Sequence, residues 1–132
     1  TSKVMSKAIG FVMVGTNDLD KSSKFYDQVL ANLGMKRVTV TERYIAYSHS
    51  SEDGGLKFYI TKPQNKENAT AGNGTMVALS AETKDAVDKF HKIALENGAM
   101  DEGKPGLRSD GNYYSYIRDL DGNKIASRFL VK

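Results

Sequence analysis

The chain has 132 residues, a formal net charge of +3 and no cysteine, which excludes disulfides, thiolate metal sites and a cysteine nucleophile and favours a cytoplasmic location. The basic residues are interspersed with acidic ones, and no apolar run approaches the ~20 residues that cross a bilayer, so neither nucleic acid nor a membrane is an expected partner. A chain of this length forms one compact domain, or two half-domains that share a core.

The first half of the chain predicts a strand, a helix and three further strands. Residues 9–15 (IGFVMVG) are typical of a buried strand. Apolar residues then recur at helical spacing from Leu19, with Asn17 or Asp18 as the N-terminal cap and Gly34 as the stop. Strand-like runs follow at 36–41, 44–48 and 56–61, with a polar hairpin at 50–55 between the last two.

The second half repeats this order after a connector. Residues 62–74 have no periodicity and are interpreted as that connector. A strand at 75–80 leads to a helix that begins at Ala81 or Glu82 and stops at Gly98. Further strands are expected at 100–107, 113–118 and 124–131. The sequence therefore predicts two β-α-β-β-β units that bury their apolar faces together.

The segment RDLDGNKIA (118–126) predicts a hairpin turn followed by the last strand. Asp121, Gly122 and Asn123 favour the turn, because Gly and Asn tolerate positive φ. The flanking runs are rich in aromatic and β-branched residues, as strands are.

Several segments together carry a resemblance to a known family. They are VMVGTNDLDKSSKFY (12–26), GNGTMVAL (72–79), DEGKPGLR (101–108) and YYSYIRDLDGNKI (113–125). Their order and spacing resemble the vicinal oxygen chelate superfamily, which includes glyoxalase I, the bleomycin-resistance proteins and the extradiol dioxygenases. The resemblance implies an α+β, glyoxalase-like fold in which two βαβββ modules form a half-open barrel around a cleft. The modules would span 9–61 and 75–132, with a linker at 62–74, and together form one glyoxalase-like domain.

The resemblance also implies a divalent metal, held by ligands from the first and last strand of each module. The matching residues are Phe11, Met76, Ala126 and, by the best alignment, Tyr59. Zn²⁺, Ni²⁺, Mg²⁺ and Fe²⁺ are held by imidazole or carboxylate ligands, and these residues offer neither. We therefore expect a cleft without the usual metal cofactor.

The two histidines offer no substitute metal site. His49 lies in a polar segment and is expected in an exposed loop, and His91 is expected at the boundary between the second helix and solvent. Neither has a second ligand at a familiar spacing.

Tyrosines and arginines are the other candidates for the cleft. Strand alternation puts Tyr114 and Tyr116 on one face and Tyr113 and Ser115 on the other, and leaves open which pair faces the cleft. The full set of cleft candidates is Phe11, Met13, Tyr59, Met76, Arg108, Tyr114, Tyr116, Ala126 and Arg128.

Two of the arginines suggest an anionic ligand. Arg108 precedes the aromatic strand, where it either binds a carboxylate or phosphate at the cleft mouth or forms a surface ion pair with Asp110. Arg128 shares the strand parity of Ala126, so both face the cleft if either does. A cation at that position favours an anion.

Three functions are compatible with these residues. The first is a glyoxalase- or bleomycin-resistance-like protein that binds a small organic molecule, with an anionic one favoured, without a metal. The second is a metal-dependent lyase or isomerase of the lactoylglutathione-lyase type, and the third is a metal-independent enzyme that uses Tyr and Arg groups. A homodimer is expected in each case, because the open edge of each half-barrel needs to be covered.

Overall fold

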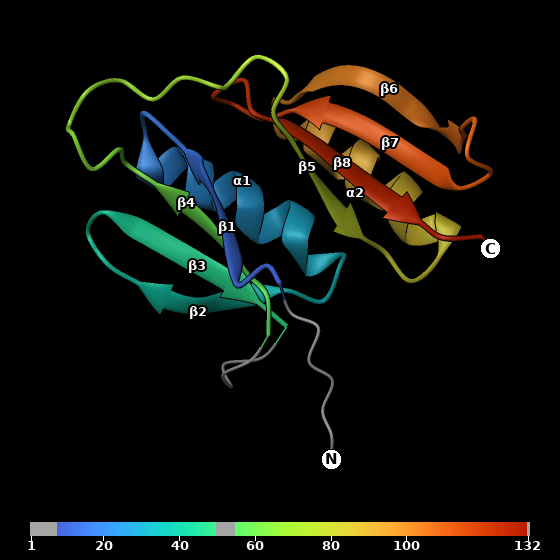
Figure 1. Cartoon of the computed structure of the whole chain (residues 1–132), viewed down its shortest axis with the longest axis horizontal. Coiled ribbons are helices and arrows are strands. Elements are labelled where there is room, and N and C mark those ends of the chain that lie inside the picture. The colour runs from blue at the N-terminus through green and yellow to red at the C-terminus, as the bar shows by residue number, and fades with distance from the viewer. Residues whose placement is uncertain (1–7, 50–54, 132) are drawn as a thin grey trace.

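The structure, a computed structural model, describes residues 8–49 and 55–131 and contains two helices and two four-stranded sheets (Figure 1). The elements of the first module are β1 (Phe11–Gly15), α1 (Leu19–Ala31), β2 (Lys36–Val40), β3 (Tyr44–Ser48) and β4 (Lys57–Thr61). Those of the second are β5 (Met76–Ser80), α2 (Lys84–Glu96), β6 (Met100–Leu107), β7 (Tyr113–Arg118) and β8 (Lys124–Phe129). Most of the hairpin predicted at 50–55 lies outside the described residues. No helix in the described ranges is both long and apolar enough to cross a membrane.

The two sheets have the same topology. Their strand orders are β1-β4-β3-β2 and β5-β8-β7-β6. The first and last strands of each module pair in parallel, and the other neighbours pair antiparallel. Neither sheet closes on itself, and the predicted α+β fold of two βαβββ modules in a half-open arrangement is confirmed.

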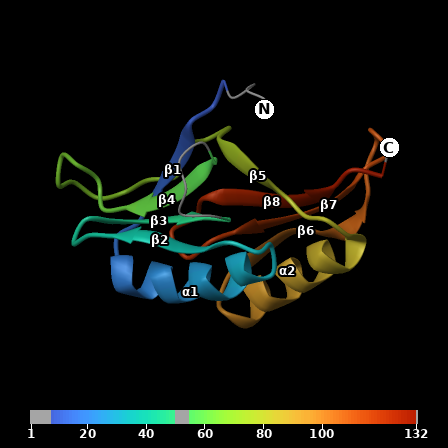
Figure 2. The same ribbon diagram turned by 90° about the horizontal axis from the view of Figure 1, so that it is seen from below.

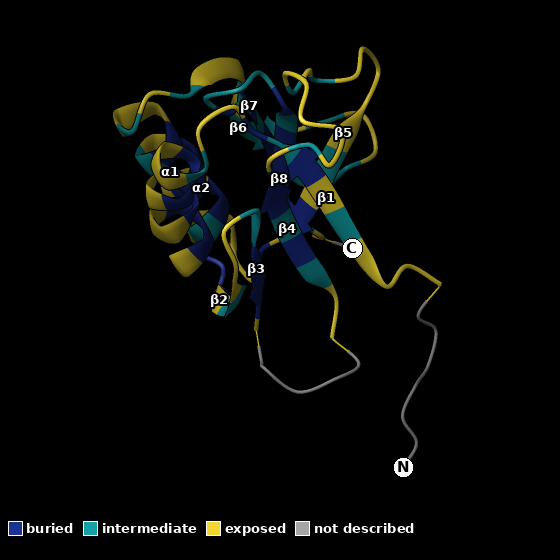
Figure 3. Cartoon of the chain, turned by 90° about the vertical axis from the view of Figure 1, so that its left-hand side faces the viewer, coloured by how far each residue is buried: buried dark blue, intermediate teal, exposed yellow. Residues whose placement is uncertain are grey.

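Each helix covers one face of its own sheet. Figure 2 shows both helices on the same side of the strands, and the two helices also contact each other. Buried residues of the helix and of the sheet form the core of each module. Figure 3 colours the buried residues dark blue. In the first module Tyr26 and Leu30 of α1 pack with Phe58 and Ile60 of β4. We call the opposite side of each sheet, turned away from the helices, its open face.

The register of the parallel pairs relates the two modules position by position. In the first module Phe11 is opposite Lys57 and Met13 is opposite Tyr59. In the second, Met76 is opposite Lys124 and Ala78 is opposite Ala126. Phe11 therefore corresponds to Met76, and Tyr59 corresponds to Ala126. All four alternate with helix-facing core residues, so they lie on the open faces.

Local capping explains where the helices begin. Asp18 caps α1 by accepting a hydrogen bond from the N–H group of Lys21, as one of the two predicted alternatives. Helix α2 begins at Lys84, later than the predicted Ala81 or Glu82, because the Thr83 side chain accepts from the N–H group of Ala86 and fixes the start there.

The turn between β7 and β8 does more than connect two strands. The Tyr26 hydroxyl group on α1 donates to Asp119, and the Asn123 side chain donates to the carbonyl oxygen of Gly15 at the end of β1 (2.9 Å). The N–H group of Asn17 donates to Asp121 (2.9 Å). The predicted turn is thus confirmed, and in addition it joins the second module to the first.

Candidate functional site

Aromatic side chains gather on the open face of the first module. The ring of Tyr59 on β4 lies between those of Phe11 and Tyr44, with ring centroids 4.9 Å and 5.4 Å away. The guanidinium group of Arg43 lies 5.4 Å from the centroid of Tyr44. Phe11 is 56% exposed and Met13 is 41% exposed, so this apolar surface is accessible in the single chain.

The connector covers part of this face. A groove of about 440 Å³ lies between the strands and the connector, and its lining includes Met13, Thr61, Asn65 and Asn68. Asn17 holds the connector by two bonds to the backbone of Ala69, of 2.7 Å and 3.2 Å. Residues 62–74 were predicted only as a linker, because a segment without periodicity does not indicate which surface it packs against.

On the open face of the second module, two tyrosines stack. The rings of Tyr114 and Tyr116 are 5.8 Å apart and 5° from parallel. Both pair with open-face residues of β8, since Tyr114 is opposite Arg128 and Tyr116 is opposite Ala126. This register therefore puts Tyr114 and Tyr116 on the side of the sheet that is turned away from α2.

The alternate residues of β7, Tyr113 and Ser115, face helix α2. The Tyr113 hydroxyl group donates to Asp88 of α2 (2.7 Å). The Ser115 and Ser127 hydroxyl oxygens lie 2.9 Å apart in the interior. These side chains are therefore part of the packing between sheet and helix.

Arg108 is on the open face, but its guanidinium group already contacts other residues of the second module. Its Nη2 atom donates to the carbonyl oxygen of Lys104 (2.6 Å), and its guanidinium group lies 5.3 Å from the centroid of Tyr116. Glycines at 103 and 106 make room for it, because a Cβ atom on Gly103 would lie 2.7 Å from Tyr116 and 3.3 Å from Arg108.

Asp110 does not form the alternative ion pair with Arg108. It accepts a 2.7 Å hydrogen bond from the Tyr114 hydroxyl group and another from the N–H group of Asn112. The bond from Tyr114 chiefly lowers the pKa of Asp110, and the same bond raises the pKa of Tyr114. Tyr114 is thus held protonated.

A carboxylate that the sequence did not single out lies on the same face. Glu102 of β6 is 3.5 Å from Arg118 and 3.8 Å from Lys124. The irregular pairing of β6 between Asp101 and Gly103 falls at this residue, which is why strand parity alone could not place its side chain. Glu102 balances two of the cations on the open face.

The positions that correspond to the metal ligands of the family do not form a metal site. Phe11, Tyr59, Met76 and Ala126 provide no imidazole or carboxylate, and Ala126 is 0% exposed beneath its neighbours. Within residues 8–49 and 55–131 no cluster of three His, Cys, Asp or Glu side chains is arranged to hold a metal. The residues therefore do not fit the expected ion.

The histidines lie elsewhere. His49 follows β3 and is exposed, as expected. His91 is only 6% exposed and its Nε2 atom lies 3.0 Å from Asp101, so the predicted position at the solvent boundary is wrong. Asp101 on β6, itself exposed, gives this buried polar ring a hydrogen-bond partner, which the helix periodicity could not reveal.

The candidate residues thus form separate groups. Phe11 and Tyr59 contact each other in the first module, and Arg108 and Tyr114 each contact Tyr116 in the second. Met76 lines a separate hollow, an apolar groove of about 520 Å³ between the edge strands β1 and β5. In the described ranges no ring contact or hydrogen bond joins the first group to the second.

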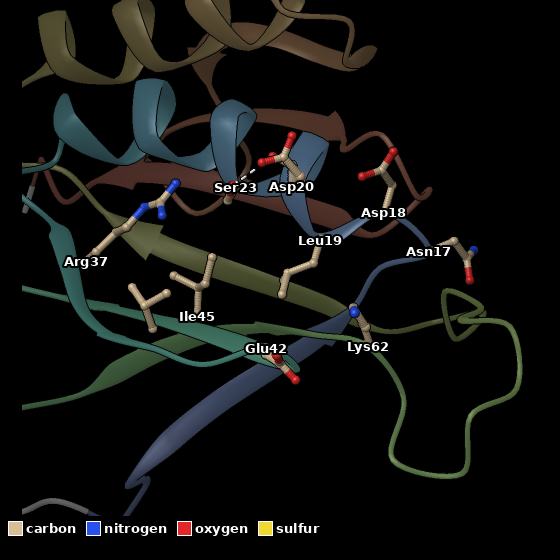
Figure 4. Close-up of a pocket in the computed structure, with 10 residues that line it drawn as sticks. Asn17, Asp18, Leu19, Asp20, Ser23, Arg37, Glu42, Ile45 and Lys62 are labelled. Carbon is tan, nitrogen blue, oxygen red and sulfur yellow. Dashed lines mark hydrogen bonds between the residues drawn. The ribbon is translucent and has the colours of Figure 1, made fainter.

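A polar groove of about 540 Å³ lies away from the open faces, between α1 and the strands of the first sheet (Figure 4). Arg37 in this groove forms a two-bond pair with Asp27, with both distances 2.8 Å. Asp20 pairs with Lys24 at 3.3 Å, and Asp18 caps the helix. These charges are used in structural contacts, so this groove is a weaker candidate than the open faces.

Sequence comparison defines the family. The model of the Glyoxalase/Bleomycin resistance protein/Dioxygenase superfamily matches residues 8–126. The chain belongs to this superfamily, as the resemblance predicted. No curated protein sequence gives a significant match.

Solved structures support the same assignment. A glyoxalase/bleomycin resistance protein from Albidiferax ferrireducens T118 is 37% identical, with a TM-score of 0.84 over 93% of this chain and 98% of the other. A lactoylglutathione lyase from Agrobacterium tumefaciens is 21% identical, with a TM-score of 0.66 over 96% of each chain. A family enzyme from Burkholderia phytofirmans PsJN is 19% identical, with a TM-score of 0.70 over 92% and 98%. The last two show likeness of fold alone.

Proposed function

We propose that this protein binds a small organic molecule on its open faces without the metal that its family commonly uses. The proposal rests on the residue types at the four positions that correspond to the metal ligands of the family. Phe11 and Tyr59 make an aromatic surface where the first module would hold ligands, and Met76 and Ala126 are the counterparts in the second. Aromatic rings beside a few oriented polar groups suit an organic ligand.

The metal-dependent alternative, a lyase or isomerase of the lactoylglutathione-lyase type, has less support. One structural neighbour carries the name lactoylglutathione lyase, but the likeness is one of fold. Such chemistry needs a bound Zn²⁺, Ni²⁺ or Fe²⁺ ion as Lewis acid. The side chains at the corresponding positions offer that ion no imidazole or carboxylate ligand.

A metal-independent enzyme is also less well supported. A tyrosine acts as a base only after it loses its proton, and the hydrogen bond to Asp110 raises the pKa of Tyr114. The guanidinium group of Arg108 donates hydrogen bonds to the carbonyl oxygens of Lys104 and Leu107. Neither residue is prepared for transition-state stabilisation.

Two measurements test the proposal. Metal analysis of protein purified without chelators is expected to find well under one Zn, Ni or Fe per chain. A screen of small organic compounds by two-dimensional NMR is expected to find ligands that shift amide signals of β1, β4, β5 and β8. Stoichiometric metal would favour the lyase. A screen with no open-face ligand would contradict the proposal.

We further propose that the protein is a cytoplasmic homodimer. The edge strands β1 and β5 each pair on one side only. They expose the apolar side chains of Phe11 (56%) and Met76 (47%), and Ile9 just before β1 is 62% exposed. Unpaired strand edges with apolar side chains favour association with another chain. Analytical ultracentrifugation at micromolar concentration is expected to give twice the 14.5 kDa chain mass. A single-chain mass would contradict the dimer.

A further inference from the structure

The open face of the second module carries several cations, and their contacts separate them. Arg118 and Lys124 share the carboxylate of Glu102. Arg108 donates to backbone carbonyl oxygens and stacks against Tyr116. In the described part of the chain, no carboxylate forms an ion pair with the remaining cation, Arg128. Arg128 is therefore the one with most capacity for an added anion.

Polar neighbours surround Arg128. It is partly buried, and it lies directly opposite Ser80 on β5 and Tyr114 on β7. Ser80 is exposed, and its hydroxyl group is available to donate a hydrogen bond. Arg128 lies within hydrogen-bonding reach of the Tyr114 hydroxyl oxygen, and this interaction opposes the rise in the pKa of that group. Because the Tyr114 proton is given to Asp110 and one side of the Arg128 guanidinium group faces the Tyr114 oxygen, the donors left for a ligand are the other N–H groups of Arg128 and the hydroxyl group of Ser80.

The surface beside Arg128 and Ser80 consists of apolar side chains. Along the open face of β5, Ser80 is followed by Ala78, which is exposed, and then by Met76, which is 47% exposed. Alternate residues on a strand are ~6.6 Å apart, so Ser80 and Met76 are about 13 Å apart along β5. That distance accommodates a body of about two fused rings.

We propose that Arg128 and Ser80 form an anion subsite, and that the ligand is an organic carboxylic acid whose apolar body lies along Ala78 and Met76. One guanidinium group and one hydroxyl group match one carboxylate, since the planar fork of arginine binds its two oxygens together. This inference rests on the proposed function and specifies the ligand class. A phosphate would carry more charge than this pair neutralises.

Calorimetric titration with a matched pair of probes tests the subsite. The carboxylate 2-naphthoate and its neutral isostere 2-naphthamide differ only in charge and hydrogen bonding. We expect the naphthoate to bind about tenfold more tightly than the amide, and inorganic phosphate alone to bind more weakly than the naphthoate. The naphthoate is also expected to shift the amide NMR signals of Ala78, Ser80 and Arg128. Equal affinity for both probes, or tighter binding of phosphate, would overturn the inference.

Two variants separate a specific site from general charge. Arg128→Gln is expected to lower naphthoate affinity to that of the amide, and Arg128→Lys to keep part of the difference. The control, Arg118→Gln, removes the same charge from the same face but from a side chain already paired with Glu102, so it should retain most of the preference. Equal losses in Arg128→Gln and Arg118→Gln would show that charge alone attracts the probe.

The outcomes also distinguish this inference from the proposed function. If the amide binds as well as the naphthoate, or if screened compounds bind only at Phe11 and Tyr59, the carboxylate subsite is wrong and organic binding stands. If no compound binds either open face, both are wrong.

Discussion

The hydroxyl group of Tyr26 donates a 2.6 Å hydrogen bond to the Oδ2 atom of Asp119, although 93 residues separate the two in the chain. Tyr26 is 0% exposed on α1, and Asp119 is 6% exposed after β7, so the bond joins the two modules away from solvent. The Oδ1 atom of Asp119 accepts from the N–H groups of Asp121 and Asn123. One carboxylate therefore shapes the turn and attaches it to the first module.

Removing this hydroxyl group should destabilise the whole chain. Tyr26→Phe leaves a buried carboxylate with one donor fewer, which costs about 1–3 kcal/mol. Urea unfolding followed by circular dichroism measures the change. Tyr59→Phe is the matched control, because no hydrogen bond of its hydroxyl group is found in the described structure, and it should change the free energy of unfolding by less than about 0.5 kcal/mol. Equal effects of the two variants would contradict the role of Tyr26.

Stability should fall in alkaline solution, in part through Tyr26. Burial and then the charge of Asp119 raise its pKa well above the ordinary value of 10.0. Between that value and the folded pKa, the folded state holds the proton that the unfolded state has lost. The contribution is therefore complete below pH 10.0 and declines as pH rises toward the folded pKa. The urea midpoint is expected to fall less steeply above about pH 10 in Tyr26→Phe than in the unaltered protein. Parallel curves would contradict this.

Asn123 should be intolerant of a negative charge. Its side-chain nitrogen donates to Gly15 in the first module (2.9 Å) and to the Oδ2 atom of Asp119 (3.0 Å). Asn123→Asp has the same shape, but it replaces both donors with acceptors and puts two carboxylates together in the interior. We expect a loss of about 3 kcal/mol or more at neutral pH, larger than the loss in Asn123→Ala. A milder effect of the aspartate, measured by urea unfolding, would show that the contact is dispensable.

Gly103 should be required for the arrangement of Tyr116 and Arg108. The Cβ atom in Gly103→Ala would lie 2.7 Å from the Cδ2 atom of Tyr116, closer than real Cβ contacts allow. We expect destabilisation of about 1–3 kcal/mol and displaced Tyr116 ring signals in NMR spectra. Gly10→Ala is the control, since nothing lies within 4 Å of a Cβ atom there. Unchanged Tyr116 signals in Gly103→Ala would contradict the packing described.

The fold was largely predictable because it depends on local signals repeated along the chain. Both helices and all eight strands were expected near their observed positions. The start of α2 was misplaced because it depends on which side chain accepts from a free N–H group at the end of the helix, and Thr83 does so here. Hydrophobic periodicity does not report that contact.

The candidate site was predictable only in part. The parity of Ala126 and Arg128 followed from strand alternation, whereas the choice between Tyr114 and Tyr113 required the register of β7 against β8. Glu102 lies at an irregularity in β6, where alternation fails. The pairing of His91 with Asp101 was likewise invisible in the helix pattern.

The sequence by itself determined the family, the two βαβββ modules and the loss of the usual metal-ligand residue types, since each depends on residue identity and short-range order. Only the tertiary structure decided which cations remain unpaired and what the turn at 119–123 contacts. Glu102 comes within reach of Arg118 and Lys124, and Asp119 within reach of Tyr26, only after the sheets and modules have packed. Hydrogen bonds and ion pairs act over a few ångströms in space, and separation along the chain does not reveal which groups come that close.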